Sequence, residues 1–432
     1  MTLSKFEYEM ENCFRCSHCK YIPWPVLKSK RFSQVCPSIT RYNFHAYSAS
    51  GRIEMALALH IGRLKEWTPG MLKILYTCTM CGACQVSCRP NNFLTDVEGI
   101  LETLRQKAVE DGVGPMPQHE AFTTSIKEKH NPYNEPHEDR SNWIPEGVEV
   151  KEKADLIYWV GCTSSYRRKE IARATVKVLN KIGVDFMLLK DDEICCGSPV
   201  YNTGQKELAK KMAKDVVERI SKSGAKKLLT ACAGCYAMFK AKYPKLVDDI
   251  PFEITSLAKI LDQKLQDGTL KFTKSVPMKV TYHDPCHMGR MSEHIPEWNG
   301  EWKLTGPHIY EPVPEKPVRL GLGGCYDPPR RVLEAIPGIE LVEMERIREY
   351  AWCCGAGAGC KSAFPDFALW AASERLEEAK STDAEILVSA CPFCSTNLKD
   401  AIEQKHEKIK FYDIAEIVLM ALEGTSGGEE SK

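Results

Sequence analysis

The residues best suited to chemistry are the 20 cysteines of this 432-residue chain. Eighteen of them fall into four regularly spaced groups, and only Cys325 and Cys360 stand apart. Residues 1–10 lack the apolar stretch of a secretory signal, and no run approaches the roughly 18 apolar residues that span a bilayer. In a reducing compartment, clustered cysteines bind metal or perform redox chemistry rather than form disulfides. We therefore expect a cytoplasmic metal or redox protein without a transmembrane segment, with membrane association through a partner left open.

The first eight cysteines have the spacing of cubane ligands. Two C-x2-C-x2-C runs each have a fourth cysteine nearby, and this pattern binds [4Fe–4S] cubanes. In two-cluster ferredoxins the fourth ligand of each cluster comes from the other run. The spacing therefore predicts two cubanes, one on Cys13, Cys16, Cys19 and Cys88 and the other on Cys78, Cys81, Cys84 and Cys36. Zinc is the alternative, but four-cysteine zinc sites use paired C-x2-C arms and fit less well.

The remaining ten cysteines repeat one pattern twice. Each copy has a single cysteine, then Cys-Cys-Gly, then C-x2-C. The first CCG set is Cys162, Cys195, Cys196, Cys232 and Cys235, and the second CCG set is Cys286, Cys353, Cys354, Cys391 and Cys394. Zinc needs four ligands and each copy offers five. A thioredoxin-like pair would leave three cysteines per copy unexplained. Five cysteines with an adjacent pair suit a cluster with an unusual ligand count.

The elements that must position these cysteines differ between the two ends of the chain. Apolar residues at helical spacing predict helices over 51–65 and 96–111, so residues 1–112 are expected to be mostly helical. Residues 113–150 combine prolines and acidic residues without periodicity, which indicates a linker or an extended surface segment. From 151 onward, strands and helices alternate, which predicts parallel sheets with crossover helices. The expected strands are 156–160, 185–189, 228–231, 278–282 and 385–389.

The repeated cysteine pattern also predicts repeated domains. Cys353 follows Cys195 by 158 residues, but Cys286 follows Cys162 by only 124, so the second copy carries an insertion of 34 residues. We expect an α+β multidomain protein: residues 1–112 a helical ferredoxin domain, 113–150 a linker, and 151–275 and 276–432 two α/β copies, with the insert near 291–324. Most of the ten cysteines follow strands, where open α/β sheets bind their ligands.

The spacing C-x32-CCG-x34-CxxC, echoed in the second copy, resembles the CCG domain of heterodisulfide reductases, and the first eight cysteines resemble their ferredoxin subunit. The fused chain is similar to the D-type subunit of that family. The resemblance implies that each CCG set binds a noncubane [4Fe–4S] cluster, and that a disulfide is reduced between the two sets. Some CCG sites hold one such cluster or another type, so one or two are expected. The insert is expected beside the disulfide pocket.

Composition narrows the choice of function and partners. Lys plus Arg and Asp plus Glu both number 58, so a nucleic-acid partner is not expected. The glycine-rich run 353–360 lacks the third glycine and the strand–helix context of a dinucleotide site, so any flavin is expected on a partner. We therefore expect a subunit of a larger complex that takes electrons from a redox partner and reduces a disulfide. The alternative is a relay without disulfide chemistry, between a flavoprotein and a larger anaerobic reductase complex such as class II benzoyl-CoA reductase. A zinc-binding interaction protein is the third hypothesis.

A few other residues have two interpretations. His283 and His287 flank Cys286 and could hydrogen-bond cluster sulfurs or donate a proton, or could simply cap the strand end. The basic run 167–169 follows Cys162, and we favour a solvated helix surface there over an anion clamp. Cys325 and Cys360 have no partner in the first copy and are expected to be plain buried or loop cysteines.

Overall fold

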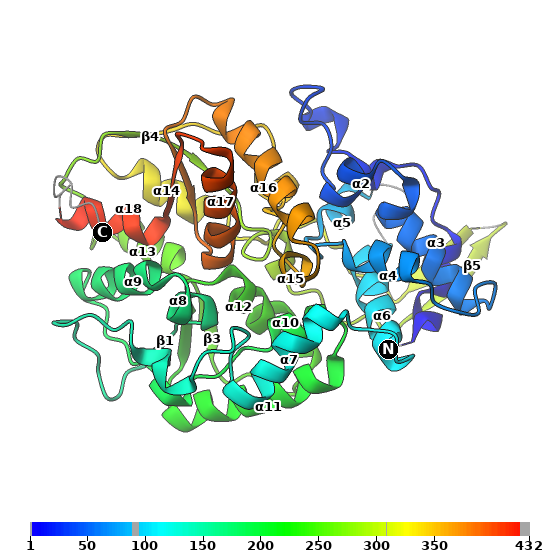
Figure 1. Cartoon of the computed structure of the whole chain (residues 1–432), viewed down its shortest axis with the longest axis horizontal. Coiled ribbons are helices and arrows are strands. Elements are labelled where there is room, and N and C mark those ends of the chain that lie inside the picture. Colours follow the sequence, from blue (N-terminus) through cyan, green and yellow to red (C-terminus); the bar gives the residue numbers. More distant parts are fainter. Residues whose placement is uncertain (1, 89–94, 308, 424–432) are drawn as a thin grey trace.

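The computed structural model describes residues 2–88, 95–307 and 309–423. Figure 1 shows a helical N-terminal module at one end of the molecule and two α/β halves beside it. Both main sheets are parallel, as the alternation of strands and helices predicts. Within the described residues, no helix combines the length and the hydrophobicity that crossing a membrane requires.

The N-terminal module, described over residues 2–88 and 95–112, is mostly helical as predicted. Polar side chains cap its longer helices: Ser48 accepts from the Gly51 amide, Thr68 from Met71 and Asp96 from Gly99. Its apolar faces bury a small core that includes Ile53 and Ile100. The helices are α1 (Glu7–Glu11), α2 (Pro37–Tyr42), α3 (Ala49–His60), α4 (Pro69–Tyr76), α5 (Ala83–Ser87) and α6 (Val97–Glu110).

The segment 113–150, expected to be a linker, contains helix α7 (Pro117–Lys129) and the 3-10 helix η6 (His137–Ser141). Pro117 stands at the start of α7, where a proline costs no hydrogen bond. Phe122 and Ile126 of α7 are buried against the first repeat, so the helix is stabilised by tertiary packing. The prolines that suggested a linker in fact flank structured elements, and the expectation of an extended segment is wrong.

The first repeat has a parallel sheet in the order β1-β2-β3, with β1 (Leu156–Trp159), β2 (Lys227–Thr230) and β3 (Glu253–Thr255). The strand expected at 185–189 is reduced to a single parallel bridge from Met187 to Ile157. The helices are α8 (Cys162–Tyr166), α9 (Lys169–Lys181), α10 (Ser198–Asn202), α11 (Lys206–Ser223), α12 (Ala233–Ala237) and α13 (Leu257–Gln266), with a π-helix η8 (Met238–Lys242) after α12.

The second repeat follows the same plan, with a parallel sheet in the order β7-β4-β8-β9. Its strands are β4 (Met278–Tyr282), β7 (Ile339–Leu341), β8 (Ile386–Ser389) and β9 (Lys410–Asp413). Its helices are α14 (Asp327–Glu334), α15 (Cys360–Ala363), α16 (Pro365–Lys380), α17 (Pro392–Lys405) and α18 (Ile414–Glu423). Strands β4, β8 and β9 correspond to β1, β2 and β3, so the architecture is repeated. The boundaries 151–275 and 276–432 themselves stay a prediction.

Packing joins the two repeats closely. Helix α18 of the second repeat packs on α9 of the first, and α12 contacts α17. Apolar side chains of both repeats belong to one continuous core, which includes Leu179 and Val418. The carboxyl ends of β1 and β4 therefore open toward a shared region, where the cysteines lie.

The insert in the second repeat forms an antiparallel hairpin of β5 (Glu301–Gly306) and β6 (Ile309–Val313). The hairpin packs on the N-terminal module, where the rings of Tyr8 and Trp302 stack with centroids 4.1 Å apart. Figure 1 shows β5 at the far end of this module, away from α12 and α17. The expectation that the insert borders the disulfide pocket is therefore wrong, because its aromatic face pairs with the first helix of the chain.

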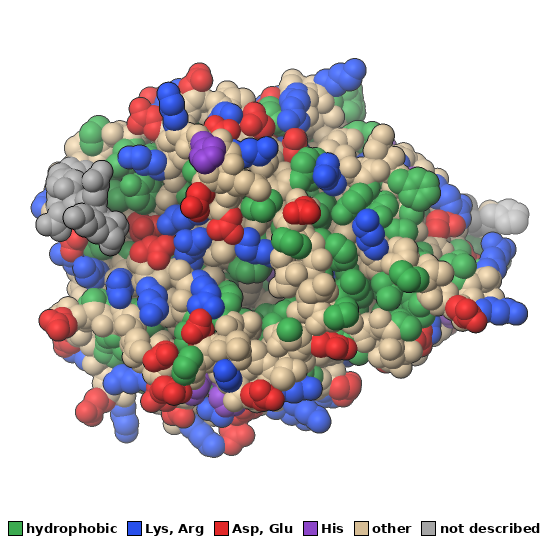
Figure 2. Space-filling view, in the orientation of Figure 1, with side chains coloured by type: hydrophobic (Ala, Val, Ile, Leu, Met, Phe, Trp, Pro, Cys, Tyr) green, Lys and Arg blue, Asp and Glu red, His purple; other side chains and the backbone are tan. Residues whose placement is uncertain are grey.

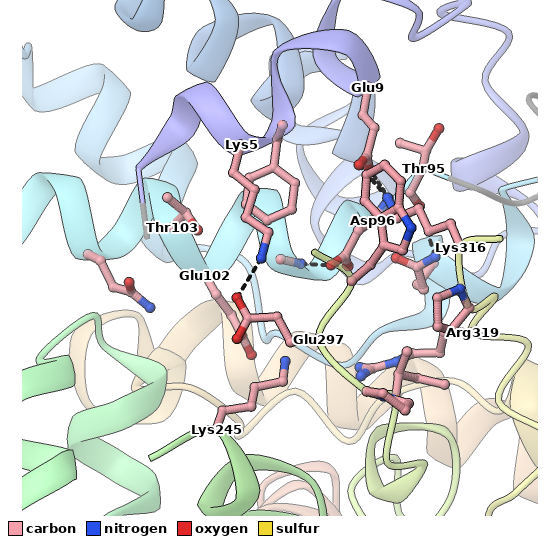
Figure 3. A pocket seen from close by; sticks show the side chains of 18 of the residues that line it. Lys5, Glu9, Thr95, Asp96, Glu102, Thr103, Lys245, Glu297, Lys316 and Arg319 are labelled. Atoms are coloured by element: carbon pink, nitrogen blue, oxygen red, sulfur yellow. Dashed lines mark hydrogen bonds and ion pairs between the residues drawn. The ribbon is translucent and has the colours of Figure 1, made fainter. Parts of the chain in front are cut away.

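Buried ion pairs tie the insert and the first repeat to the N-terminal module. Lys242 of η8 pairs with Glu98 and Glu102 of α6, and Lys316 of the insert pairs with Glu9. Figure 3 shows Glu9, Lys316 and their neighbours around a polar cavity of about 160 Å³ at this junction. The ion pairs around it join cations and carboxylates of the protein itself, so this cavity belongs to the packing between modules.

Candidate iron–sulfur sites

The first group of four cysteines lines a small cavity in the N-terminal module. Its members are Cys13, Cys16, Cys19 and Cys88. Arg15 and Ser17 have positive φ angles of 54° and 71°, which turn the backbone tightly between the cysteines. The structure thus brings together the four residues that the crosswise spacing rule predicts. Of these, Cys16 is exposed and the others are partly or fully buried.

The second group of four cysteines lines a separate cavity between α2, α3 and α5. Its members are Cys36, Cys78, Cys81 and Cys84. Met80 and Gly82 have positive φ angles of 48° and 72° and turn the backbone on either side of Cys81. This is again the predicted crosswise grouping, since Cys36 comes from the first run. Both groups fit the two cubanes that the spacing predicts.

The chemistry of these donors fits a bound metal cluster. Burial raises the pKa of the Cys36 and Cys88 thiols to about 12. Buried thiols in such a cavity stay protonated near neutral pH unless a cation stabilises the thiolates. Bound iron would supply that positive charge, and thiols that coordinate a metal lose their protons outright.

All ten cysteines of the two CCG sets line one cavity of about 260 Å³ between the repeats. The first CCG set follows β1 and β2, and the second follows β4 and β8, at the carboxyl ends of parallel strands. Neutral residues complete the described lining: it includes Phe122, Tyr133, His287 and Phe393 but no Asp, Glu, Lys or Arg. The cavity therefore combines thiols with an uncharged wall.

Within each CCG set the thiols are hydrogen-bond neighbours in the same order. In the first set Cys162 neighbours Cys195, and Cys196 neighbours Cys235. In the second, Cys286 neighbours Cys353, and Cys354 neighbours Cys394. Gly197 and Gly355, which follow the adjacent cysteines, have φ angles of 81° and 90°. A residue with a Cβ is strained there, which explains the glycine of each CCG motif.

Two further thiol contacts join the CCG sets to each other and to the N-terminal module. Cys232 neighbours Cys391, so the two CCG sets touch each other directly. Hydrogen bonds from the Cys232 and Cys394 thiols, followed by backbone amides at the start of α17, lower the pKa of Cys391 well below its usual value. Cys353 neighbours Cys81 of the second cubane group. The described cysteines thus form a continuous series from the N-terminal module to the far CCG set.

Arg290 holds the N-terminal module against the second CCG set. Its buried guanidinium donates to the Cys81 carbonyl at 2.6 Å and to the Ala351 carbonyl at 2.8 Å. Gly357 lies so close to the Thr79 carbonyl that a Cβ there would be 2.8 Å from it. These backbone contacts fix the approach of Cys81 to Cys353.

The two singled-out histidines lie at the second CCG set. A nitrogen of His283 and the sulfurs of Cys354 and Cys394 lie within 4.8 Å of one another. Nδ1 of His283 accepts from Arg375, and its Nε2 has no partner among the described groups. Nδ1 of His287 is 3.2 Å from the Cys286 sulfur. Burial lowers the pKa of His283 to about 3 and of His287 to about 4, so both rings are neutral.

The remaining candidates have structural roles. Arg167 pairs with Glu135, and Arg168 donates to Thr396, so the basic run is engaged in surface contacts. Cys360 donates to the Tyr76 carbonyl at 3.2 Å, and Cys325 lies 3.9 Å from the Ser256 hydroxyl. Neither of these two cysteines lines a cysteine cavity.

Sequence reasoning missed Arg140. Both terminal nitrogens of its guanidinium contact the Cys162 sulfur, at 3.7 and 3.6 Å. Arg140 lies in the segment that was expected to be a linker, and no spacing signal connects it to Cys162. The contact between Arg140 and Cys162 depends on the fold and cannot be predicted from the spacing of the residues.

Comparisons with known families agree with this arrangement. Residues 9–92 match the 4Fe-4S dicluster domain family, and residues 156–240 and 318–399 match the cysteine-rich domain family called CCG. The fold and the sites define an iron–sulfur electron-transfer oxidoreductase subunit.

The relatives of this chain include named reductases and reductase subunits. The D-type subunit of dihydromethanophenazine:CoB–CoM heterodisulfide reductase from Methanosarcina mazei is 35% identical over 424 residues, which is 96% of this chain and 94% of the relative. The chain belongs to this family of D-type heterodisulfide reductase subunits. More distant relatives are the B-type subunit of fumarate reductase (CoM/CoB) from Methanothermobacter marburgensis, 29% identical over 82% of this chain and 62% of the relative, and EtfAB:quinone oxidoreductase of Syntrophomonas wolfei, 25% identical over 96% and 58%.

Proposed function

We propose that this chain is the subunit of a larger reductase complex that reduces a disulfide in the cavity between its two repeats. The observation that carries the proposal is that both CCG sets line that one cavity and meet at Cys232 and Cys391. Reduction of a disulfide takes two electrons and two protons and yields two thiols. Two adjacent redox centres suit a reaction of that stoichiometry.

The proposed cofactors follow from the four groups of cysteines. Two cubane [4Fe–4S] clusters would be held by the two groups of four cysteines, and one or two noncubane [4Fe–4S] clusters by the two CCG sets. When bound, such clusters supply one-electron transfer. The protein's own contribution is to bury the thiols within an uncharged wall and to hold the cysteine groups in fixed order.

The lining of the cavity favours one class of disulfide. No charged side chain lies among its described lining residues, while Phe122, Tyr133 and Phe393 contribute aromatic surface. An anionic group deep in such a cavity would lose its hydration without gaining a cationic partner. We therefore propose a disulfide whose groups next to sulfur are uncharged. Turnover of 2-hydroxyethyl disulfide and of the disulfide of 2-mercaptoethanesulfonate should then differ, with the uncharged compound reduced faster.

The N-terminal module would receive the electrons. Cys16 is exposed, and its neighbour Phe14 exposes 66% of its surface. Figure 2 shows hydrophobic side chains gathered on the half of the molecule that this module occupies. We propose that a redox partner, a flavoprotein or another iron–sulfur protein, docks near Cys16. The relatives are subunits of complexes, and the proposed site of action is the cytoplasm, with any membrane attachment through the partner.

The test uses anaerobically purified full-length protein, reduced and then mixed with a disulfide while EPR spectra are collected. The proposal predicts a new or shifted signal from the CCG sets and release of thiols. Cys353→Ser should lose both responses, whereas Cys325→Ser, a buried cysteine outside the cavity, should keep them. Full metal loading without any response to a disulfide would count against disulfide reduction, and zinc without acid-labile sulfide would count against iron–sulfur clusters altogether.

A relay without disulfide chemistry is the second candidate. The match of 96% of this chain to an EtfAB:quinone oxidoreductase favours it. In this case the chain would pass electrons between a flavoprotein and a further reductase, and would co-purify with both. Rapid disulfide turnover with an artificial electron donor would exclude the relay as the sole function.

A further inference from the structure

Arg140 is a buried cation placed against one cysteine of the first CCG set. It is 2% exposed, and two of its guanidinium nitrogens contact the Cys162 sulfur. The residue comes from η6, in a segment that lies outside the matched family regions 9–92, 156–240 and 318–399. Arg140 is therefore supplied to the first CCG set by the segment between the ferredoxin module and the first repeat.

Glu193 fixes the position of this guanidinium. One carboxylate oxygen accepts from Arg140 at 2.8 Å and from the Gly161 amide at 2.9 Å, and the other accepts from the Val160 amide at 2.9 Å. Arg140 also donates to the Ile194 carbonyl at 3.2 Å. Because Glu193 and Ile194 directly precede Cys195, the arginine is anchored to two parts of the same cysteine set.

The second CCG set has a different neighbour at the matching position. Cys286 corresponds to Cys162, and the side chain against its sulfur is the imidazole ring of His287, with Nδ1 at 3.2 Å. Ala351 stands where Glu193 stands in the first repeat. The buried cation near the second set is Arg290, and its described hydrogen bonds go to backbone carbonyls, including those of Cys81 and Glu349, rather than to a sulfur. The two sets therefore share their cysteines but differ in the group that contacts the leading sulfur.

We propose that Arg140 is a positioning residue that raises the reduction potential of the centre held by the first CCG set. A positive charge beside a ligand sulfur stabilises the reduced, more negative state, and does so strongly in a buried site of low dielectric. Since the second CCG set adjoins Cys81, an electron from the N-terminal module would arrive there first and be drawn on to the first set. This inference rests on the proposed iron–sulfur function.

The experiment is a redox titration followed by EPR on full-length, anaerobically loaded protein. In Arg140→Gln the ratio of reduced to oxidised first-set centre at a fixed potential should fall about tenfold, which is about 59 mV for one electron. Arg140→Lys keeps the charge and should recover most of this ratio. Arg331→Gln removes an arginine charge from α14 of the second repeat, where Arg331 pairs with Asp262 of the first repeat, and should leave the ratio unchanged.

Glu193→Gln provides the opposite arm, because it leaves the Arg140 charge uncompensated and should raise the same ratio. Iron and sulfide analysis shows whether each variant has bound its clusters. If Arg140→Gln fails to bind them, Glu193→Gln tests the role of Arg140 instead. An unchanged ratio in a loaded Arg140→Gln protein, equal ratios in the Gln and Lys variants, or a fall in Glu193→Gln would each overturn the role of Arg140. Absence of iron from the wild-type chain would instead overturn the proposed function.

Discussion

The thiols of Cys81 and Cys353 are hydrogen-bond neighbours across the boundary between the N-terminal module and the second repeat. These residues belong to different predicted clusters, one a cubane group and the other a CCG set. Arg290 donates to the Cys81 carbonyl, and Gly357 lies against the Thr79 carbonyl, so the two backbones are held together here. In the proposed function, this contact would give electrons a short route between modules that lie far apart in the sequence.

Replacing Cys81 tests this junction. We expect Cys81→Ser to lower the iron content by one cluster and to slow reduction of the CCG sets by an artificial donor that reduces the N-terminal module. Cys360→Ser is the matched control, because Cys360 is buried in the same interface but lines no cysteine cavity. The measurement is iron and sulfide content together with EPR after rapid mixing. Equal behaviour of the two variants would contradict the proposed route.

The buried cation Lys242 tests the interface between α6 and η8. Lys242→Met removes the cation that Glu98 and Glu102 share, so that Glu102 keeps only the Tyr201 hydroxyl, and breaking a buried pair in this way costs about 3–5 kcal/mol of unfolding free energy. Lys222→Met removes a cation from an exposed pair with Glu218 and should cost less than about 0.5 kcal/mol. Urea unfolding followed by circular dichroism measures both values. A similar loss in the two variants would show that the buried pair adds little.

His119 predicts a pH dependence of stability. Burial, followed by the nearby Arg105 charge, lowers the pKa of His119 to about 4 from an ordinary value of 6.5. The ring is held neutral, with Nε2 against the Gly359 carbonyl at 3.1 Å. Because the folded pKa lies below the unfolded one, the stability is fully present above pH 6.5 and is lost as pH falls toward 4.

The loss amounts to at most about 3 kcal/mol, since one pKa unit is about 1.4 kcal/mol. His119→Gln keeps a donor for the Gly359 carbonyl but has no charge to gain. Unfolding midpoints in urea, measured from pH 5 to 8, should therefore slope less in His119→Gln than in the wild type. Parallel slopes would refute the assignment of this pH dependence to His119.

The hairpin insert makes a testable contact with the start of the chain. Tyr8 and Trp302 stack at 4.1 Å, and we expect a coupling of about 0.5–1.5 kcal/mol in a double-mutant cycle of Tyr8→Ala and Trp302→Ala. Thermal unfolding of the two single variants and the double variant gives this value. Additive losses would mean that the stack does not hold the hairpin in solution.

Much of the architecture follows from cysteine spacing and from periodicity. The crosswise grouping of Cys88 and Cys36 follows from the ferredoxin rule, because two-residue gaps place only three thiols on one cluster. The repeated sheets follow from apolar strands that end at cysteines. These are local signals, and each lies within a few residues of the feature that it predicts.

Long-range packing is what the sequence does not reveal. Phe122 and Ile126 are too few apolar residues to predict the helix α7 in a segment rich in prolines. Burial against the first repeat stabilises this helix. The approach of Arg140 to Cys162 and of Trp302 to Tyr8 joins residues whose spacing carries no pattern. Met187 reaches β1 through a single bridge, so the apolar run at 185–189 does not become a strand in the fold.

The ion pairs of the insert bear on how the chain is made. Glu9 and Glu98 belong to the N-terminal module, but their buried partners Lys316 and Arg319 are synthesised some 200–300 residues later. On the ribosome Glu98 can gain Lys242 once the first repeat is made, but Glu9 must wait for Lys316 until the start of the second repeat has emerged. The contacts between the insert and the module therefore form only after both groups of four cysteines have been synthesised.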